Sequence, residues 1–268
     1  MSDIRPASTV LLLRDGPRKP PLEVFMVKRH GDIDFAGNAL VFPGGKVDGA
    51  DRNGVMREVA IGVEDLSDED VAFRACAIRE TFEETGVLLA VDEDGLFPAS
   101  DNRLAHAQQH LNEGDFGFID LLDSFQLKMA FDQLVPFARW IAPKFAPKRF
   151  DTWFYLCRLP PDQNPVHDGG ETTDSLWVRP NDAVGMAEAR EATIIFPTRM
   201  NLMKLGQADT LTGAFMHARN ADIVPIEPWI EERDGVKVLT IPSNAGYPVT
   251  EELLSSAISS VASSSVRE

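Results

Sequence analysis

Three glutamates stand close together in the segment SDEDVAFRACAIRETFEETGV, which spans residues 67–87. In a helix, Glu80, Glu83 and Glu84 fall within about 100° of one another on one side. Like charges at this spacing repel each other by about a few tenths of a kcal/mol per pair, and a divalent cation removes that cost. Mg²⁺ prefers oxygen ligands and is often shared with substrate phosphates, so these side chains predict a metal site for phosphate chemistry. The alternative is a solvated acidic face, which is the usual role of a run of charges.

The same segment carries the signals of a helix with defined ends. Ser67 is a capping residue with Asp70 three positions later as a partner, and Gly86 stands where a helix commonly stops. On the side opposite the glutamates, apolar residues recur at helical spacing and predict a face packed on a core: Val71, Ala75, Ile78 and Phe82.

The stretch RETFEETGV, residues 79–87, resembles the second half of the Nudix box, and FPGG, residues 42–45, resembles the loop that opens this box. Thr81 stands where the box has an apolar residue. From Gly45 to Arg79 the chain runs 79 − 45 = 34 positions, about 20 more than in the box. Counted back from Arg79, the early glutamate of the box would fall at Val71, which leaves the partner of Arg79 open. Glu83, four residues further on, is one candidate.

The interrupted box is similar to the Nudix branch represented by the peroxisomal coenzyme A diphosphatase, which also splits its box. The resemblance extends to about residue 206 and implies a diphosphate hydrolase that uses Mg²⁺ or Mn²⁺. The resemblance also implies four metal-binding residues, which are Gly44, Glu80, Glu83 and Glu84. Of these, Glu83 and Glu84 are also expected to be catalytic. Structural roles are implied for Gly45, Arg79 and Gly86.

A base must deprotonate the attacking water, and the predicted candidate is Glu171. It lies in the loop before the expected strand at residues 175–179, where several Nudix enzymes place a further acidic residue. Asp174 is a weaker alternative because it abuts the strand, and His167 is a rival in the same loop.

Two basic residues are predicted to bind substrate phosphates, Arg29 and Lys46. Coenzyme A diphosphatases carry an Arg, a second Arg five residues on and then a Gly ahead of the FPGG turn. Here Arg29 matches, the second Arg falls at Asp34, and the Gly falls at Asn38. For Arg29 the alternative is an ordinary surface pair at the end of a strand.

Composition limits the classes of partner. The 268 residues are 44% hydrophobic and carry a net charge of 26 − 42 = −16, which disfavours non-specific binding to nucleic acid or anionic membranes. Two cysteines give no disulfide framework and no zinc pattern. No apolar run suggests a signal peptide or a membrane span, and the terminal Ser-Val-Arg-Glu is not a peroxisomal address. We therefore expect a cytoplasmic protein with a small nucleoside diphosphate as substrate, and the resemblance leaves a homodimer open.

Strands and helices mix without regular alternation, which indicates an α+β fold, and the resemblance implies the Nudix α/β/α sandwich with a mixed sheet. A Nudix domain is expected over residues 1–206, with an insertion at about 49–66 and a helical excursion at about 99–134. A C-terminal extension follows over 207–268. Strands are expected over residues 8–14, 22–29, 39–42, 135–142, 150–159 and 175–179. Helices are expected over residues 103–111, 118–134, 181–189 (capped by Asn181), 198–205, 209–219 and 250–261, with a hairpin of residues 223–230 and 236–241.

Three hypotheses for function follow. The first is hydrolysis of coenzyme A or acyl-coenzyme A to 3′,5′-ADP and phosphopantetheine. The second keeps the chemistry but takes ADP-ribose, NADH or a dinucleoside polyphosphate. The third is a Nudix module that senses a nucleotide without cleaving it, which a missing early glutamate would permit.

Overall fold

A computed structural model describes residues 4–31 and 37–257. Its centre is an eight-stranded sheet with the order β10-β2-β1-β9-β8-β11, in which β3 also pairs with β2 and β4 with β1. The pairs β1·β9 and β8·β11 are parallel and the other pairs are antiparallel, so the sheet is mixed. The strands are β1 (Ile4–Asp15), β2 (Leu22–Arg29), β3 (Leu40–Val41), β4 (Gly44–Lys46), β8 (Val135–Ile141), β9 (Arg149–Arg158), β10 (Thr172–Val178) and β11 (Pro225–Ile226).

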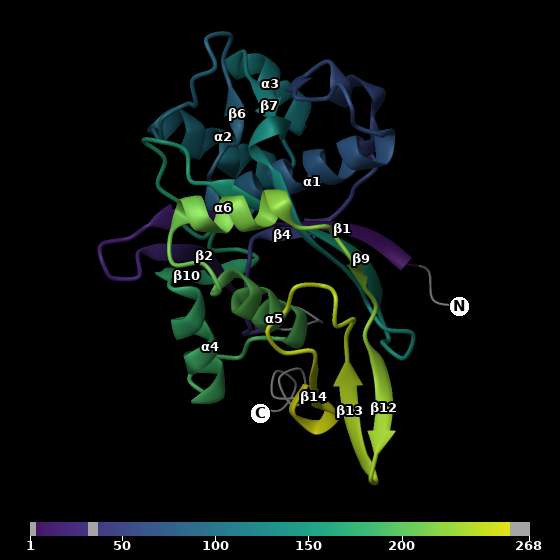
Figure 1. Ribbon diagram of the computed structural model, residues 1–268. Helices are drawn as coiled ribbons and strands as arrows, with labels where there is room; N and C mark the ends of the chain where they lie inside the picture. Colours follow the sequence, from purple (N-terminus) through teal and green to yellow (C-terminus); the bar gives the residue numbers. More distant parts are fainter. Residues whose placement is uncertain (1–3, 32–36, 258–268) are drawn as a thin grey trace.

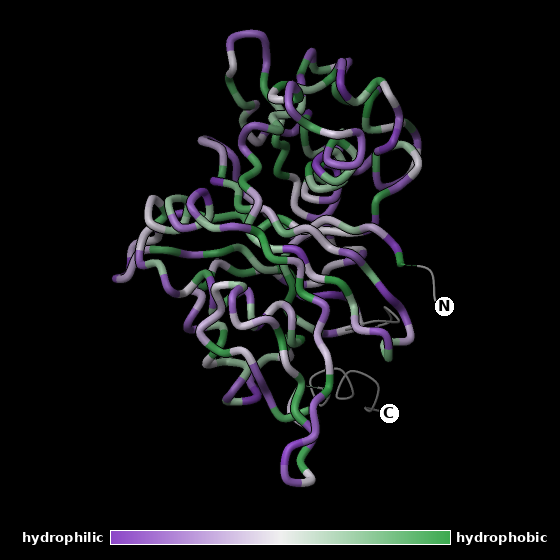
Figure 2. Tube along the Cα trace, turned by 45° about the vertical axis from the view of Figure 1, so that its right-hand side comes forward, coloured by the Kyte–Doolittle hydropathy of each residue, from purple (hydrophilic) through white to green (hydrophobic). Residues whose placement is uncertain are grey.

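Both faces of the sheet are covered by helices, because side chains along the central strands are apolar on both sides. Along β1, Val10 and Leu12 join one core cluster, whereas Leu11 and Leu13 join the other. Figure 1 shows α1 (Asp68–Thr85), α2 (Asn102–Glu113) and α3 (Phe118–Phe125) above the sheet, and α4 (Pro180–Glu188) and α5 (Phe196–Leu205) below it. The central strands are largely hydrophobic in Figure 2. The predicted α+β class and the α/β/α sandwich are confirmed.

Helix α1 begins and ends where its sequence predicts. The Ser67 hydroxyl accepts a hydrogen bond from the backbone N–H of Asp70, and the Asp70 carboxylate accepts one from the backbone N–H of Ser67. Gly86 ends the helix with a φ of 70°. The predicted core face is buried, with Val71, Ala75, Ile78 and Phe82 each at most 4% exposed. The helix is therefore fixed on the sheet, and its other side is presented away from the core.

The turn that contains Gly44 and Gly45 is positioned where β1 and β2 no longer pair with each other. These strands pair with each other only near the hairpin that joins them, where Leu13–Asp15 lie opposite Leu22–Val24. Beyond that point β4 pairs with residues 7–9 of β1, and β3 pairs with residues 27–28 of β2. The connection between β3 and β4 therefore runs between the two strands and beneath the C-terminal half of α1.

The insertion and the excursion together build a second, small sheet. The insertion forms the short 3₁₀ helices η1 (Ala50–Arg52) and η2 (Gly54–Arg57) and then β5 (Ala60–Ile61). Strand β5 pairs with β7 (Lys128–Ala130), which also pairs with β6 (Ala90–Val91). The helix predicted over residues 103–111 is confirmed as α2.

The second helix of the excursion is shorter than predicted. It was expected over residues 118–134, but α3 ends at Phe125 and Gln126 takes a left-handed φ of 55°. Met129 is buried, as its spacing suggests, but from strand β7 and not from a helix. Burial of a side chain does not distinguish a helix from a strand, and here pairing with β5 and β6 decides that residues 128–130 form a strand.

Two predictions in the C-terminal part are wrong. Helix α4 starts after Arg179 with Pro180 in its first turn, so Asn181 does not cap it and instead donates to the carbonyl of Gly206. Residues 251–253, expected in a helix, form β14 (Glu251–Leu253) on the edge of β13 (Val236–Thr240). Residues 254–257 form one helical turn, and the rest of the expected helix lies outside the described residues. The hairpin and its turn are confirmed: β12 (Trp229–Arg233) and β13 are joined by Asp234 and Gly235, which both have positive φ. The predicted first strand at residues 223–230 is misplaced, because β12 begins at Trp229 and Pro225–Ile226 form the separate strand β11 beside β8.

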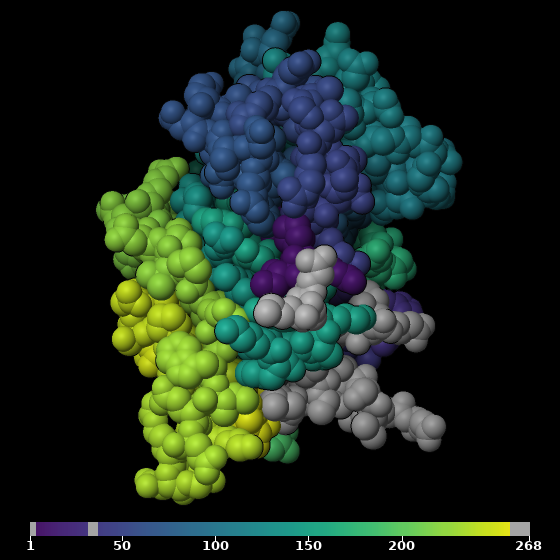
Figure 3. All heavy atoms as spheres, turned by 90° about the vertical axis from the view of Figure 1, so that its right-hand side faces the viewer, coloured from purple at the N-terminus to yellow at the C-terminus, as the bar shows by residue number. Residues whose placement is uncertain are grey.

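Residues 207–257 pack mostly on the lower half of the molecule, and Figure 3 shows them in green to yellow along one side of it. Helix α6 (Leu211–Asn220) packs in the same core cluster as α4 and α5. The hydroxyl of Tyr247, 7% exposed, accepts from Trp140 at 2.9 Å and donates to Asn201 at 2.7 Å. In the part of the chain that the structure describes, no helix is long and apolar enough to cross a membrane.

Replacing Tyr247 by Phe is expected to destabilise the protein by about 2–3 kcal/mol, because Trp140 and Asn201 would each lose a buried hydrogen-bond partner. Urea unfolding, followed by tryptophan fluorescence, measures the change. A Trp140→Phe, Tyr247→Phe double variant should lose less than the sum of the single variants. A strictly additive result would contradict the coupling.

Candidate active site

The glycine turn lies directly against two of the three glutamates. The backbone N–H of Gly44 donates to Glu84 Oε2 at 3.1 Å. A Cβ atom at Gly45 would come within 2.4 Å of the Glu80 carboxylate carbon, so only glycine allows this approach. At Gly44, with a φ of 152°, a Cβ would meet the carbonyl oxygen of Ser8 at 2.3 Å. The structure therefore brings together the two motifs that the sequence separates by the insertion.

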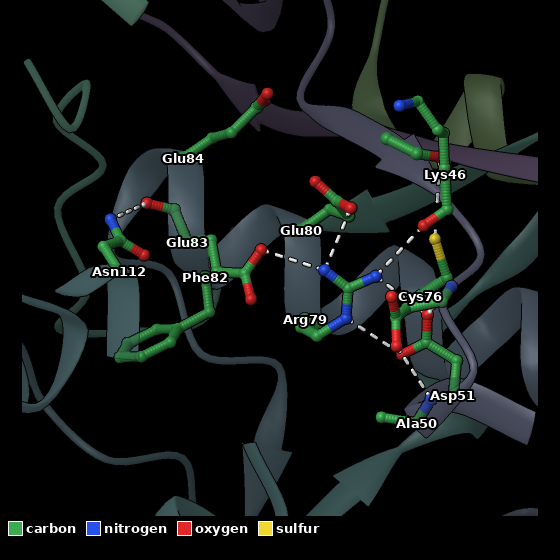
Figure 4. A network of polar contacts seen from close by, with 12 residues as sticks. Lys46, Ala50, Asp51, Cys76, Arg79, Glu80, Phe82, Glu83, Glu84 and Asn112 are labelled. Carbon is green, nitrogen blue, oxygen red and sulfur yellow. Dashed lines mark hydrogen bonds and ion pairs between the residues drawn. The ribbon is translucent and has the colours of Figure 1, made fainter. Parts of the chain in front are cut away.

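Arg79 is the centre of the polar network beside the glutamates. Its Nε and Nη2 donate to the two carboxylate oxygens of Asp51 at 2.9 and 2.8 Å. Its Nη1 lies 2.9 Å from both Glu80 and Glu83, and its Nη2 also donates to the carbonyl of Lys46. Figure 4 shows Asp51, Glu80 and Glu83 converging on the guanidinium, whereas Glu84 points away from it.

Asp51 is the site residue that the sequence analysis missed. Its side chain is 1% exposed and makes a two-pronged ion pair with Arg79, so Glu83 is a partner but not the main one. The position of the early acidic residue can be counted backward from Arg79 or forward from the glycine turn, and only the forward count finds it. Asp51 stands six positions after Gly45. Val71, found by counting back, is buried in the core, and the insertion therefore begins after Asp51.

The electrostatics of the site favour a bound cation. Burial raises the pKa of Glu80 to about 7, and Glu83 adds to this, although Arg79 opposes it. Burial and then the charge of Glu80 raise the pKa of Glu84 well above its usual range, against the Gly44 N–H and Arg29. Burial also raises the pKa of Glu83. Crowded carboxylates repel each other, and burial deprives their charges of hydration. A bound divalent cation offsets both of these unfavourable free-energy terms.

The remaining predicted residues surround the same end of α1. Arg29, at the end of β2, is close enough to lower the pKa of Glu84, and its Nε has no hydrogen-bond partner among the described residues. Glu171 is exposed, and its charge acts on both Glu83 and Glu84. Lys46 is exposed and touches the network through its backbone carbonyl.

The two alternatives to Glu171 are engaged elsewhere. The Nδ1 atom of His167 lies 3.2 Å from the Ser175 hydroxyl, and Asp174 accepts from the backbone N–H of Ser175 at 2.8 Å. The roles given to Gly44, the glutamates, Arg29, Lys46 and Glu171 stay predictions at this point.

Comparison with known proteins identifies the family. A family model described as the NUDT19 Nudix domain matches residues 57–205, more than half of the chain. The chain belongs to this family of Nudix hydrolases. It is similar to two proteins named acyl-coenzyme A diphosphatase NUDT19. The protein from Xenopus laevis is 25% identical, and the match covers 86% of this chain and 73% of that protein. The protein from Gallus gallus is 26% identical, and the match covers 91% of this chain and 80% of that protein.

A solved structure supports the same assignment. The crystal structure of a NUDIX hydrolase from Alicyclobacillus acidocaldarius matches with a TM-score of 0.72 and 29% identity, over 81% of this chain and 97% of that one. The chain is therefore an enzyme of the Nudix class with the expected fold.

Nudix hydrolases use divalent cations in general, and the donor set of this Nudix hydrolase fits such ions, because carboxylates and a backbone carbonyl are hard oxygen ligands. Among the described residues, the one set of three His, Cys, Asp or Glu side chains whose ligand atoms all lie within 4.8 Å of one another is His110, Glu113 and Asp115, which are exposed at and just after the C-terminal end of α2. The ligand atoms of the three glutamates of α1 are spaced more widely.

The raised pKa of Glu80 makes a prediction for the metal-free Nudix hydrolase. A carboxyl with a pKa of about 7 in the folded state and 4.5 as its ordinary value binds more protons folded than unfolded. Stability should therefore fall as the pH rises from about 4.5 to about 7 and then level off. A divalent cation replaces the proton, so it should raise Tm more at about pH 8 than at about pH 5.

Thermal unfolding over this pH range in EDTA, and again with millimolar Mg²⁺, measures both effects. Glu80→Gln should flatten the metal-free profile. A metal-free Tm that rises across the same interval would contradict the argument.

Proposed function

We propose that this Nudix hydrolase cleaves the diphosphate of coenzyme A or acyl-coenzyme A to 3′,5′-ADP and (acyl-)phosphopantetheine with Mg²⁺ or Mn²⁺. The observation that carries the reaction type is the buried Glu84 and the half-buried Glu80 beside the Gly44-Gly45 turn, with Glu80 and Glu83 held by Arg79 and its partner Asp51. The relatives named acyl-coenzyme A diphosphatase support the substrate.

Each residue has a role in the proposal. The carboxylates of Glu80, Glu83 and Glu84, with the Gly44 carbonyl, hold the cations. Bound cations supply neutralisation of the phosphate charge and a more acidic water. Glu83 and Glu84 act at the reacting centre, and the exposed carboxylate of Glu171 accepts the proton of the attacking water.

Arg29 and Lys46 are proposed to bind substrate phosphates. Among the residues that the structure describes, the Nε of Arg29 has no hydrogen-bond partner, and a planar guanidinium suits phosphate oxygens. Lys46 stands exposed at the end of the glycine turn. Gly45, Gly86 and Arg79 are proposed to shape and support the site.

One backbone angle supports the coenzyme A signature. Its glycine position is occupied by Asn38, which has a φ of 61°. Asn is the residue that most readily replaces Gly in this left-handed region, so the turn keeps the conformation that a glycine there would provide. Arg29 stands at the first position of the signature, and Asp34, at the second, lies outside the described residues.

The argument for a non-hydrolytic nucleotide sensor depended on an absent early carboxylate. Asp51 supplies that carboxylate to Arg79, so the argument no longer holds.

Mass spectrometry of the products tests the proposal. The full chain is incubated with coenzyme A, an acyl-coenzyme A, ADP-ribose, NADH or a dinucleoside polyphosphate, each with Mg²⁺ or Mn²⁺. The expected products are 3′,5′-ADP and phosphopantetheine, formed at the highest kcat/KM. Preferred cleavage of ADP-ribose, NADH or the polyphosphate would overturn the substrate, and no cleavage of any compound would overturn the reaction.

A further inference from the structure

The last turn of α1 has a feature that the Nudix box does not explain. This turn carries Glu83 and Glu84, and helix ends leave backbone carbonyls without partners inside the helix. The C-terminal end of a helix also carries a partial negative charge, which acts against carboxylates placed there. The site therefore needs hydrogen-bond donors at this helix end.

Helix α2 supplies these donors from side chains. Gln108 Nε2 donates to the carbonyls of Phe82 at 3.1 Å and Glu83 at 3.0 Å. Asn112 Nδ2 donates to the same Glu83 carbonyl at 3.0 Å. Gln108 and Asn112 are four residues apart, so both amides stand on one side of α2.

The position of the donors is fixed by the packing of α2. Leu104 and Ala107 are 2% and 8% exposed and belong to the same core cluster as α1. Gly86 leaves room for the contact, since a Cβ there would lie 3.1 Å from Gln108 Oε1. The helical excursion is therefore held against the end of α1 by both core packing and hydrogen bonds.

Glu83 is consequently held from two sides. Its carboxylate lies 2.9 Å from Arg79, and its carbonyl accepts from both amides of α2. Figure 4 shows Asn112 at the carbonyl of Glu83, on the other side of this residue from Arg79.

We infer that Gln108 and Asn112 are positioning residues that fix the Glu83–Glu84 turn in the geometry that binds the cation. The inference rests on the proposed function for the role of these glutamates. The side-chain amides act through the backbone of α1.

The test compares variants of the full chain. Gln108→Met combined with Asn112→Ala removes both donor amides, and with them all three hydrogen bonds, while keeping the volume of the half-buried Gln108 side chain. Gln109→Ala is the matched control, because Gln109 lies on the exposed side of α2 and bonds only to Glu113 among the described residues. Gln108→Lys with Asn112→Ala is the rescue variant, since an ammonium donates to carbonyls and its charge suits a helix C-terminus.

Hydrogen–deuterium exchange without metal is the first readout. In the double variant, amides of residues 84–87 should exchange about tenfold faster, while those of residues 70–78 at the start of α1 stay unchanged. Mn²⁺ titration is the second readout, and affinity should fall about tenfold, as for other residues that orient metal ligands. The control should match the parent chain, and the rescue variant should regain most of both losses.

Unchanged exchange at residues 84–87 would overturn the inference, even if activity fell. Faster exchange with unchanged Mn²⁺ affinity would also overturn it, because the donors would then serve stability alone. Neither readout involves substrate, so failure of the parent chain to cleave coenzyme A would count against the proposed function and not against the positioning role.

Discussion

Replacing Glu84 by Gln is expected to lower kcat on the order of a thousandfold, because the variant keeps the shape of the side chain but loses a charge needed for the transition state. Glu84 is 7% exposed, accepts from Gly44 and has a strongly raised pKa caused first by burial.

The same substitution should not harm the fold. Since the folded protein favours the neutral form of this side chain, the metal-free Gln variant should unfold at an equal or higher Tm than the parent chain. Millimolar Mg²⁺ should then stabilise it less than it stabilises the parent chain. Loss of activity together with retained or increased Tm separates a functional role from a structural one.

Glu69→Gln is the matched control for this experiment. Glu69 lies exposed in the first turn of the same helix, far from the glycine turn. It should keep the turnover of the parent chain. Full turnover by Glu84→Gln with coenzyme A would contradict the assignment of the active site.

Replacing Asp51 by Ala is expected to destabilise the protein by about 3 kcal/mol, since breaking a buried ion pair leaves the other charge without its main partner. Asp51 and Arg79 are 1% and 12% exposed at the side chain and make two hydrogen bonds to each other. Activity should fall as well, because Arg79 orients Glu80 and Glu83, and a misplaced ligand weakens the metal site.

A double-mutant cycle measures the coupling. Asp51→Ala, Arg79→Ala and the double variant are compared by urea unfolding, and the double variant should lose clearly less than the sum of the single losses. Asp48→Asn serves as the control, because this exposed carboxylate in the same turn bonds, within the described part of the chain, only to the backbone of Ala50. Additive losses would show that Asp51 does not hold Arg79 in solution.

Of the two residues changed in these variants, the sequence predicted Glu84 as a site residue but did not predict Asp51. The ends of α1 and the side on which its glutamates lie follow from interactions within a few residues, namely the Ser67–Asp70 capping box, the left-handed Gly86 and the helical period. The contact between the glycine turn and the glutamates was expected from the resemblance and is present. The sheet strands followed from short apolar runs bounded by polar and glycine-bearing loops, and β1, β2, β8 and β9 lie close to their expected positions.

Where local pattern and long-range pairing compete, pairing decides. Residues 128–130 and 251–253 carry spacing that suits a helix, yet each segment adds to the edge of a strand distant in sequence. The free energy of such pairing depends on a neighbour whose position no local pattern reveals.

By itself, the sequence determined which helix carries the acidic side chains and which family the chain resembles. Only the tertiary structure decided that Asp51 holds Arg79, 28 residues away, and that Gln108 and Asn112 hold the end of α1 from another helix. The physical reason is that caps and helical periods are set by neighbours along the chain. An ion pair or a side-chain cap between distant segments exists only after the core has packed and brought both segments to the same place.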